Sequence, residues 1–417
     1  MTKPTSNLSQ HSDFKKLWAA QAVSAFGSTV TRTLLPILAI MTIGAGPMEV
    51  SILSALSVAP GVLVGLLMGG RVDRSKKRPL LIGSDLIRAL MLATVPVAAW
   101  LDLLTMMQLY VVAAIVGAAT TLFRITDNAY LPALIGKPDL VEANSKLEVT
   151  DAVAEVGAPT LAGILIEIVS APMAILFDTI SYLVSAVFLG LIDKKEDTPE
   201  PEIERPTLKR DIVIGMKAML EHPLVRPLFF VFIVGNFFNG FFAALYMIFA
   251  LETLNVPPGI LGVLIGLGGI GAILGAFIAR WLPARIGLGP AMILLLGLGQ
   301  GSLVLIPLAN GPDWVIIACL GVQQFLGDAL MVAYFILQTS LRQTVLPQNV
   351  LGRANATIPI AVGATLPFSI LFAGWLAATT DVRSIVWIGA IGGNALVFIL
   401  FFSQIRTLKE MPKVEEE

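Results

Sequence analysis

Long apolar runs recur from one end of this 417-residue chain to the other. A helix needs about 20 consecutive, mostly apolar residues to cross the hydrocarbon core of a bilayer. Division at charged or Gly/Pro-rich breaks gives twelve such runs: residues 15–43, 48–70, 79–101, 107–135, 141–169, 172–192, 224–252, 257–281, 289–309, 314–341, 350–378 and 382–405. Charged residues make up 14% of the chain, against about a quarter in soluble domains. We therefore expect an all-α polytopic membrane protein with twelve transmembrane helices.

One long polar segment, "DKKEDTPEPEIERPTLKRD", separates the sixth run from the seventh. It predicts an N-terminal six-helix half (1–192), a cytoplasmic linker (193–223), a C-terminal six-helix half (224–405) and a cytoplasmic tail (406–417). The halves also resemble each other. "LVEANS" (140–145) and "LGRANA" (351–356) lie 211 residues apart, and "GGRVDR" (69–74) and "GAFIAR" (275–280) lie 206 residues apart. Two matches at nearly one offset indicate a parallel duplication into pseudo-symmetric halves, an arrangement found in secondary transporters.

The distribution of Lys and Arg predicts the orientation. With both termini in the cytoplasm, 24 of the 28 basic residues fall in cytoplasmic segments, and only Arg383 falls outside. Cytoplasmic loops carry such an excess. The polar N-terminal segment has no cleavable signal before the first apolar run. We expect a multi-pass protein of the cytoplasmic (inner) membrane.

Several function classes are disfavoured by composition. A net charge of −1 provides no positive electrostatic potential that would attract nucleic acid. One cysteine, Cys319, and two histidines, His11 and His222, leave no Cys or His metal site. We find neither a phosphate-binding G-x-x-x-x-G-K-[ST] loop nor a nucleophile elbow. We expect no catalytic site and no cofactor, so the chain is not predicted to be an enzyme or a non-transporting sensor. The expected energy source is a proton gradient, the expected partners are a small-molecule substrate, protons and membrane lipid, and the expected state is a monomer.

The stretch "GGRVDRSKKRP" (69–79) resembles the loop between helices 2 and 3 of the major facilitator superfamily. In that loop a glycine is followed, after three residues, by Asp-Arg and a basic cluster. The matching residues are Gly69, Asp73, Arg74, Lys77 and Arg78, whereas Lys76 stands where many members have glycine. The stretches 123–135, 177–189 and 341–356 resemble the branch of macrolide-efflux and enterobactin-exporter-like proteins. The resemblance implies the major facilitator fold and secondary active transport.

The same loop predicts a cytoplasmic gate. Asp73 is placed to cap a helix N-terminus in the opposite half, where the helix dipole favours a carboxylate. Arg74 and Arg78 are placed to hold neighbouring acids or carbonyls. An ordinary positive-inside loop would explain the basic residues, but it would not explain Asp73 in register with Gly69.

Three acids lie along one face of the fifth predicted helix. Glu148, Asp151 and Glu155 are spaced i, i+3, i+7. Counted from residue 141 at about 1.5 Å per residue, they lie roughly 10, 15 and 21 Å deep, and Arg32 of the first helix is level with Glu155. Ionisable groups at such depth usually line a path or pair with one another. An acid there can take up and release a proton, whereas arginine keeps its own. We predict a proton-coupling group of Arg32, Asp151 and Glu155.

The remaining charges of the N-terminal half predict a cytoplasmic network. Its expected members are Asp85, Arg88, Arg124, Asp127 and Glu148. Balanced charges near helix ends also serve simply to hold helices together, and this alternative stays open.

"GAPTLAG" (157–163) resembles the helix 5 antiporter motif of the superfamily, Gly-Pro-x-x-Gly-Gly, with Ala158 before the proline. Pro159 predicts a kink, and Gly157 and Gly163 allow close helix contact. The motif favours export, although ordinary small-residue packing explains the glycines equally well. The middle-helix arginine motif of helix 4 is absent, because residues 111–121 are uncharged.

The C-terminal half has few charges but carries polar residues on its first and fourth helices. In this superfamily those helices line the central cavity. The predicted substrate-cavity residues are Asn236, Asn239, Tyr246, Gln323, Gln324 and Asp328. Tyr334 and Gln338 mark the same helix. Asp328, the only deep acid of this half, is placed to bind a cationic or hydroxylated substrate or to pair with a neighbouring amide.

These observations favour a proton-coupled exporter of a bulky amphipathic small molecule, such as a drug, a macrolide or a siderophore, that works by alternating access. A lipid or lysolipid transporter is a second interpretation. An uptake symporter could use the same acids and is a third.

Overall fold

The computed structural model describes residues 8, 11–136, 139–194, 196 and 208–412, apart from the side chains of residues 73, 208–211, 348–349 and 356. Every regular element in this part of the chain is helical. Twelve helices are long and apolar enough to cross a membrane. Their bounds agree with the predicted runs to within a few residues; the run at 107–135, for example, is Met106–Ile135. The expected all-α architecture with twelve transmembrane helices is confirmed.

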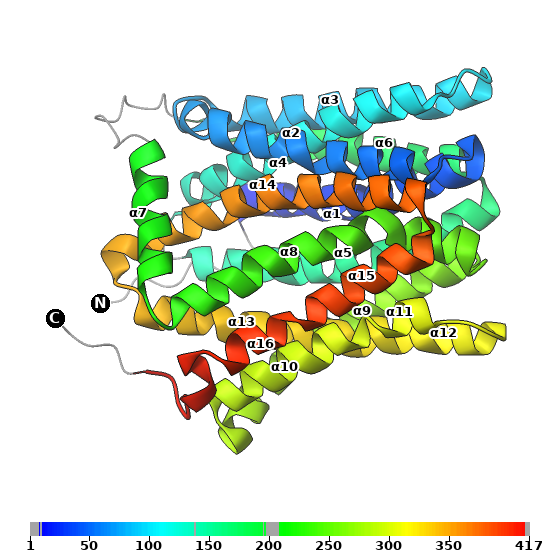
Figure 1. Ribbon diagram of the computed structural model, residues 1–417. Coiled ribbons are helices and arrows are strands. Elements are labelled where there is room, and N and C mark those ends of the chain that lie inside the picture. The colour runs from blue at the N-terminus through cyan, green and yellow to red at the C-terminus, as the bar shows by residue number, and fades with distance from the viewer. Residues whose placement is uncertain (1–7, 9–10, 137–138, 195, 197–207, 413–417) are drawn as a thin grey trace. The chain divides into compact units, whose positions relative to one another are not determined.

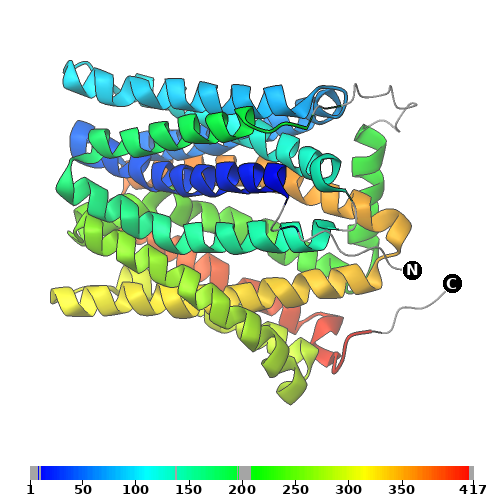
Figure 2. The ribbon, with the colours of Figure 1, turned by 180° about the vertical axis from the view of Figure 1, so that it is seen from behind.

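The chain divides into two compact units, residues 1–203 with 258–266, and residues 204–257 with 267–417. The first unit holds the helices α1 (Ser12–Leu38), α2 (Pro47–Asp73), α3 (Lys77–Trp100), α4 (Met106–Ile135), α5 (Leu140–Ile168) and α6 (Ala171–Gly190) (Figure 1). Within it α1 packs against α5 and α6, α3 packs against α4 and α6, and α2 packs against α4. Figure 2 shows α1, in blue, running between α5 and α6. This packing places α1 directly beside the helix that carries the acid stripe.

The second unit contains the remaining helices. They are α7 (Leu208–Glu221), α8 (Val225–Ile248), the part of α9 (Pro258–Ile286) from residue 267, α10 (Leu288–Ser302), α11 (Leu305–Leu308), α12 (Asp313–Val322), α13 (Asp328–Val345), α14 (Gln348–Thr379), α15 (Val382–Asn394) and α16 (Leu396–Phe401). Helix α8 packs against α14, α15 and α16, and α10 packs against α13. Buried side chains that include Leu228, Met292, Leu295 and Tyr334 form the core between them.

In the described part of the chain, three five-residue π-helical turns continue α-helices, two at the end of a span and one within a span. They are η2 (Ala39–Ile43), η4 (Phe249–Thr253) and η5 (Gln323–Gly327). The turn η4 follows η2 by 210 residues, and each extends the first membrane span of its half. This offset is close to those of the two sequence repeats, so the positions of the π-helical turns also indicate a duplication.

The segment predicted as a linker contains helix α7. Met216, Met219 and Leu220 are spaced three and four residues apart, which gives the helix an apolar face. Met219 is buried in a cluster with Val225 and Phe229 of α8. The sequence predicts a polar linker here, whereas the structure has a helix whose apolar face packs within its own unit.

Candidate functional site

Arg32 on α1 and Glu155 on α5 form an ion pair. The Arg32 Nη2 donates to Glu155 Oε1 at 2.7 Å and to Oε2 at 2.6 Å. The two side chains are 64% and 54% exposed. More than half of the surface of each side chain is therefore left uncovered by the described residues, so the two groups can separate without unpacking the helices around them.

Asp151 lies one helical turn before Glu155 on α5 and is also exposed. Its carboxylate is within electrostatic range of Glu148 and Glu155. Among the described residues it forms no ion pair, so the predicted group of three is, in the structure, one pair and one unpaired acid. The shared helical face is as expected, but the arginine reaches only the deeper acid.

Asp85 and Arg88 of α3 form a second ion pair of a different kind. Their side chains are 0% and 1% exposed. Ser185 of α6 donates to Asp85 Oδ2 at 2.7 Å. The Arg88 guanidinium lies over the Phe123 ring at 4.5 Å and over the Tyr182 ring at 4.0 Å. A pair enclosed in this way holds α3, α4 and α6 together and is costly to break.

The predicted cytoplasmic network does not form as one unit among the described residues. Asp127 accepts a hydrogen bond from Gln21 of α1. Arg124 and Glu148 are exposed and join no ion pair in the described part of the chain. The prediction grouped these residues by depth, whereas helix rotation turns Arg88 into the bundle and Arg124 out of it.

Sequence reasoning missed Asp178, which is fully buried on α6. It accepts a hydrogen bond from the Ser181 hydroxyl at 2.8 Å. A Cβ built on Gly27 of α1 would lie 3.0 Å from Asp178 Cγ, so glycine permits the close approach of α1 and α6 here. The signal was available, because an acid within an apolar run stands out.

The loop after α2 is anchored within its own unit. Arg78 donates from Nε to the Leu189 carbonyl at 2.8 Å and from Nη2 to the Gly190 carbonyl. The backbone N–H groups of Lys77 and Arg78 donate to Glu196 at 2.5 and 2.6 Å. Arginine thus binds carbonyls at the end of α6, as expected, while Glu196 caps the start of α3.

Three further residues belong to the predicted gate: Gly69, Asp73 and Arg74. Asp73 is the last residue of α2, and its side chain lies outside the described residues. Arg74 is the exposed C-cap of that helix. No heavy atom lies within 4 Å of a Cβ built on Gly69.

Helix α5 runs unbroken through the predicted kink residues. Pro159 lies inside it, and Ala158, Pro159 and Gly163 are buried. A Cβ on Gly157 would lie 3.3 Å from the Phe26 ring of α1. The small residues therefore serve close packing.

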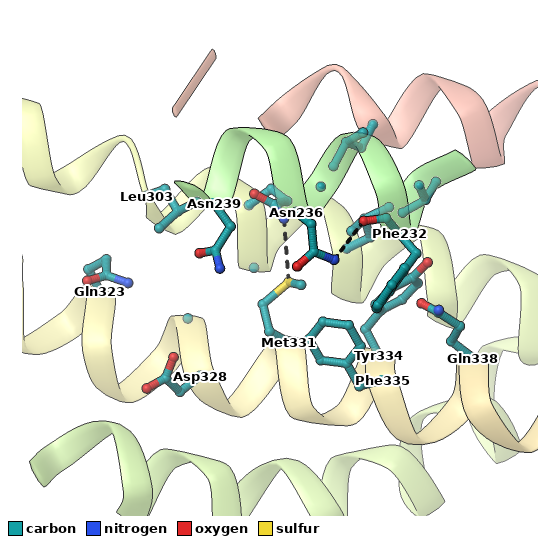
Figure 3. Close-up of a pocket in the computed structure, with 17 residues that line it drawn as sticks. Phe232, Asn236, Asn239, Leu303, Gln323, Asp328, Met331, Tyr334, Phe335 and Gln338 are labelled. Atoms are coloured by element: carbon teal, nitrogen blue, oxygen red, sulfur yellow. Dashed lines mark hydrogen bonds between the residues drawn. The ribbon is translucent and has the colours of Figure 1, made fainter. Parts of the chain in front are cut away.

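A cavity of about 220 Å³ lies inside the C-terminal unit, between α8, α10, α16 and the helix formed by α12, η5 and α13. Four of the predicted residues line it: Asn236, Asn239, Gln323 and Asp328. Figure 3 shows Asn236 and Asn239 on α8 facing the helix that carries Met331, Tyr334 and Gln338. Two predicted residues, Tyr246 and Gln324, are not part of the lining. Gln300 of α10 lines the cavity and was missed, although it is a lone amide in an apolar run.

The π-helical turn η5 decides which polar residues reach this cavity. In a regular α-helix residues five apart point about 140° away from each other. The wider turn of a π-helix, with its i to i+5 hydrogen bonds, brings such residues to one side. Gln323 and Asp328 are five apart, flank this turn and both line the cavity, whereas Gln324 does not.

Three buried oxygen atoms at the cavity lack a hydrogen-bond partner among the described residues: Gln323 Oε1, Tyr334 Oη and Gln338 Oε1. Asn236 donates to its own helix, at the Phe232 carbonyl. A buried acceptor without a donor is costly. The lining residues therefore include three oxygens whose hydrogen bonding is not completed by the described residues.

No group of three or more His, Cys, Asp or Glu side chains that could hold a metal ion occurs within the described ranges.

The chain is similar in sequence to known transporters over most of its length. It is 22% identical over 378 residues to macrolide efflux protein A of Streptococcus pyogenes, covering 87% of this chain and 89% of that protein. It is 24% identical over 384 residues to YvqJ, an uncharacterised transporter of the MFS type from Bacillus subtilis (strain 168), covering 89% and 88%.

Solved structures share the fold. A bacterial homologue of the iron transporter ferroportin, in its inward-facing state, matches with a TM-score of 0.71 at 16% identity, covering 93% of this chain and 98% of the other. The nucleoside transporter NupG matches with a TM-score of 0.67 at 13% identity, covering 93% and 98%. The family model described as Major Facilitator Superfamily matches residues 17–363. With twelve spans and two six-helix halves, the chain belongs to the major facilitator superfamily.

Proposed function

We propose that this transporter is a proton-coupled exporter of a bulky amphipathic small molecule, located in the cytoplasmic membrane with both termini inside. Transport proceeds by alternating access, with the two halves rocking about a site near the midplane. The likeness to macrolide efflux protein A supports drug-like cargo, and the helix 5 motif supports export.

The observation that carries the coupling proposal is the exposed pair of Arg32 and Glu155 with unpaired Asp151 beside it. Among the described residues, the N-terminal spans contain two arginine–acid pairs, which differ in burial. Breaking the enclosed Asp85–Arg88 pair costs about 3–5 kcal/mol, which suits a fixed support. The Arg32–Glu155 pair is not enclosed in this way, so its members can separate without unpacking the helices, which suits a group that must change partners in every cycle.

In the proposed cycle a proton binds Asp151 or Glu155 from the outer side. Protonation of Glu155 removes the charge that holds Arg32, which frees the guanidinium and loosens α1 from α5. Release of the proton to the cytoplasm restores the pair. Because arginine keeps its proton throughout, only the acids carry the transported charge.

The test is transport by the purified protein in liposomes under an imposed pH gradient, with a panel of fluorescent amphipathic compounds. We expect Glu155→Gln and Asp151→Asn to abolish gradient-driven transport while leaving gradient-independent exchange of bound compound intact. Glu142→Gln is the matched control, because Glu142 is an exposed acid in the first turn of the same helix and pairs with Lys146 of that helix.

Gradient-driven transport that survives in both acid variants would refute the coupling assignment. Accumulation of the compounds on the alkaline side of the membrane, in the direction of proton flow, would instead identify an uptake symporter.

A further inference from the structure

Asp328 has no counter-charge at the C-terminal cavity. It is the only acid among the lining residues, and none of them is lysine, arginine or histidine. Within the described part of the chain it forms no ion pair. A single carboxylate among apolar helices is unfavourable unless a cation or water meets it. A positively charged group that enters the cavity would supply the counter-charge that the lining lacks.

One polar side chain beside Asp328 suits the same charge. Gln323 precedes Asp328 by five residues across the π-helical turn and lines the cavity with it. Its Oε1 has no hydrogen-bond partner among the described residues, and an amide oxygen accepts a hydrogen bond from an ammonium group. Tyr334 and Gln338 lie six and ten residues further along the same helix, about 9 and 15 Å away, and border the other end of the cavity in Figure 3.

Aromatic side chains form part of the cavity wall. Phe232 comes from α8, and Tyr334 and Phe335 come from α13. The face of an aromatic ring attracts a cation, by about 0.5–2 kcal/mol depending on how far water is excluded. A wall of this kind holds a quaternary ammonium, which has no N–H to donate, as well as a protonated amine.

The cavity is small for the proposed cargo. Its volume is about 220 Å³, whereas pockets that enclose drug-sized ligands measure about 300–1,000 Å³. It can hold one moiety of a bulky molecule and not the whole of it.

We propose that this cavity binds the cationic head group of the substrate, a protonated amine or a quaternary ammonium, against Asp328, while the apolar body lies outside it. The inference rests on the proposed function, since it names the substrate class of that same transporter. Glycine at position 268 of α9 leaves room for the acid, because a Cβ there would lie 3.2 Å from Asp328 Cγ.

The test is equilibrium binding to the purified full-length protein in lipid nanodiscs, with no gradient. The probes are benzyltrimethylammonium and its neutral carbon isostere, neopentylbenzene, which has the same shape without the charge. We expect the protein to bind the cation more tightly than the isostere. Asp328→Asn should weaken binding of the cation about tenfold or more and leave binding of the isostere unchanged.

Two further variants keep the test decisive. Asp313→Asn removes an exposed acid from the first turn of α12 and should bind both probes as the unaltered protein does. Gly268→Ala displaces the Asp328 carboxylate without changing its charge, and should weaken cation binding selectively even if Asp328→Asn fails to fold.

Equal binding of the two probes, or cation binding that neither folded variant at Asp328 or Gly268 alters, would overturn the proposal. The outcome is separable from that of the transport experiment. Selective cation binding without pH-driven transport would refute the proton coupling alone, and pH-driven transport without selective cation binding would refute the head-group assignment alone.

Discussion

The enclosed pair of Asp85 and Arg88 gives the sharpest stability prediction. Asp85→Asn leaves the Arg88 guanidinium 1% exposed between two rings with no counter-charge. Removal of one partner of a buried pair costs about 3–5 kcal/mol. For a cooperative unit of about 200 residues, each kcal/mol lowers Tm by roughly 2–4 °C. We therefore expect a loss of about 6–20 °C, and a similar loss for Arg88→Met.

The double variant, Asp85→Asn with Arg88→Met, distinguishes the energy of the pair from the cost of leaving one buried charge unpaired. With both charges removed, no unpaired charge remains, and the Met sulfur can still contact the Phe123 and Tyr182 rings. Replacement of a buried pair by apolar groups is often neutral, so the double variant should recover most of the Tm. The assay is thermal unfolding of the detergent-purified protein, followed by loss of the monodisperse chromatographic peak. Glu142→Gln, which breaks an exposed pair, should change Tm by only about 1–2 °C. The reasoning fails if Asp85→Asn is as mild as that control, or if the double variant loses the sum of the single losses.

Two further predictions concern Tm. Asp381, between two spans, caps α15; hydrogen bonding from Ser384 holds the pKa of this carboxyl below its usual value. Asp381→Ala should cost about 1 kcal/mol of folding free energy near neutral pH. The hydrogen bonds that lower the pKa stabilise only the charged carboxylate, so the difference in Tm from the unaltered protein should shrink as pH falls below about 4. A difference in Tm that persists in acid would contradict this cause. Gly27→Val places atoms against α6 and should cost about 1–3 kcal/mol of folding free energy. Gly83→Ala is the control, because its new Cβ would meet no heavy atom within 4 Å outside its own helical turn, and it should be neutral or stabilising. Equal Tm values for these two variants would refute the packing argument.

The spans could be predicted from the sequence because length and apolar character along one chain decide them. Depth is also a one-dimensional quantity, and counting residues from the membrane surface placed Arg32 level with Glu155, where the structure has their ion pair. Depth says nothing about rotation. Arg88 and Arg124 lie at similar depth, yet one is buried against Tyr182 and the other is exposed.

The cavity was predicted in part for a related reason. The polar residues on α8 and α13, the helices that line the cavity, can be recognised in the sequence. The choice of Gln323 over Gln324 depends on the π-helical turn between them and Asp328. Such a turn depends on tertiary packing, so no local pattern predicts it. Asp178 could not be assigned for the same physical reason, because a lone acid in the apolar run of α6 does not reveal whether its carboxylate faces the bundle interior.

The turn η5 makes the cavity tolerant of one particular change in chain length. It spans Gln323–Gly327, and its i to i+5 hydrogen bonds take up one residue more than a regular turn does. Deletion of one residue between Gln323 and Asp328 would leave these two side chains four apart in a regular α-helix, about 40° from each other and still on the cavity side. The same deletion in a regular turn of this helix would rotate one part of the lining by about 100° relative to the other. Homologous chains that share the binding chemistry should therefore tolerate the loss of one residue within η5 and keep their length in the turns on either side.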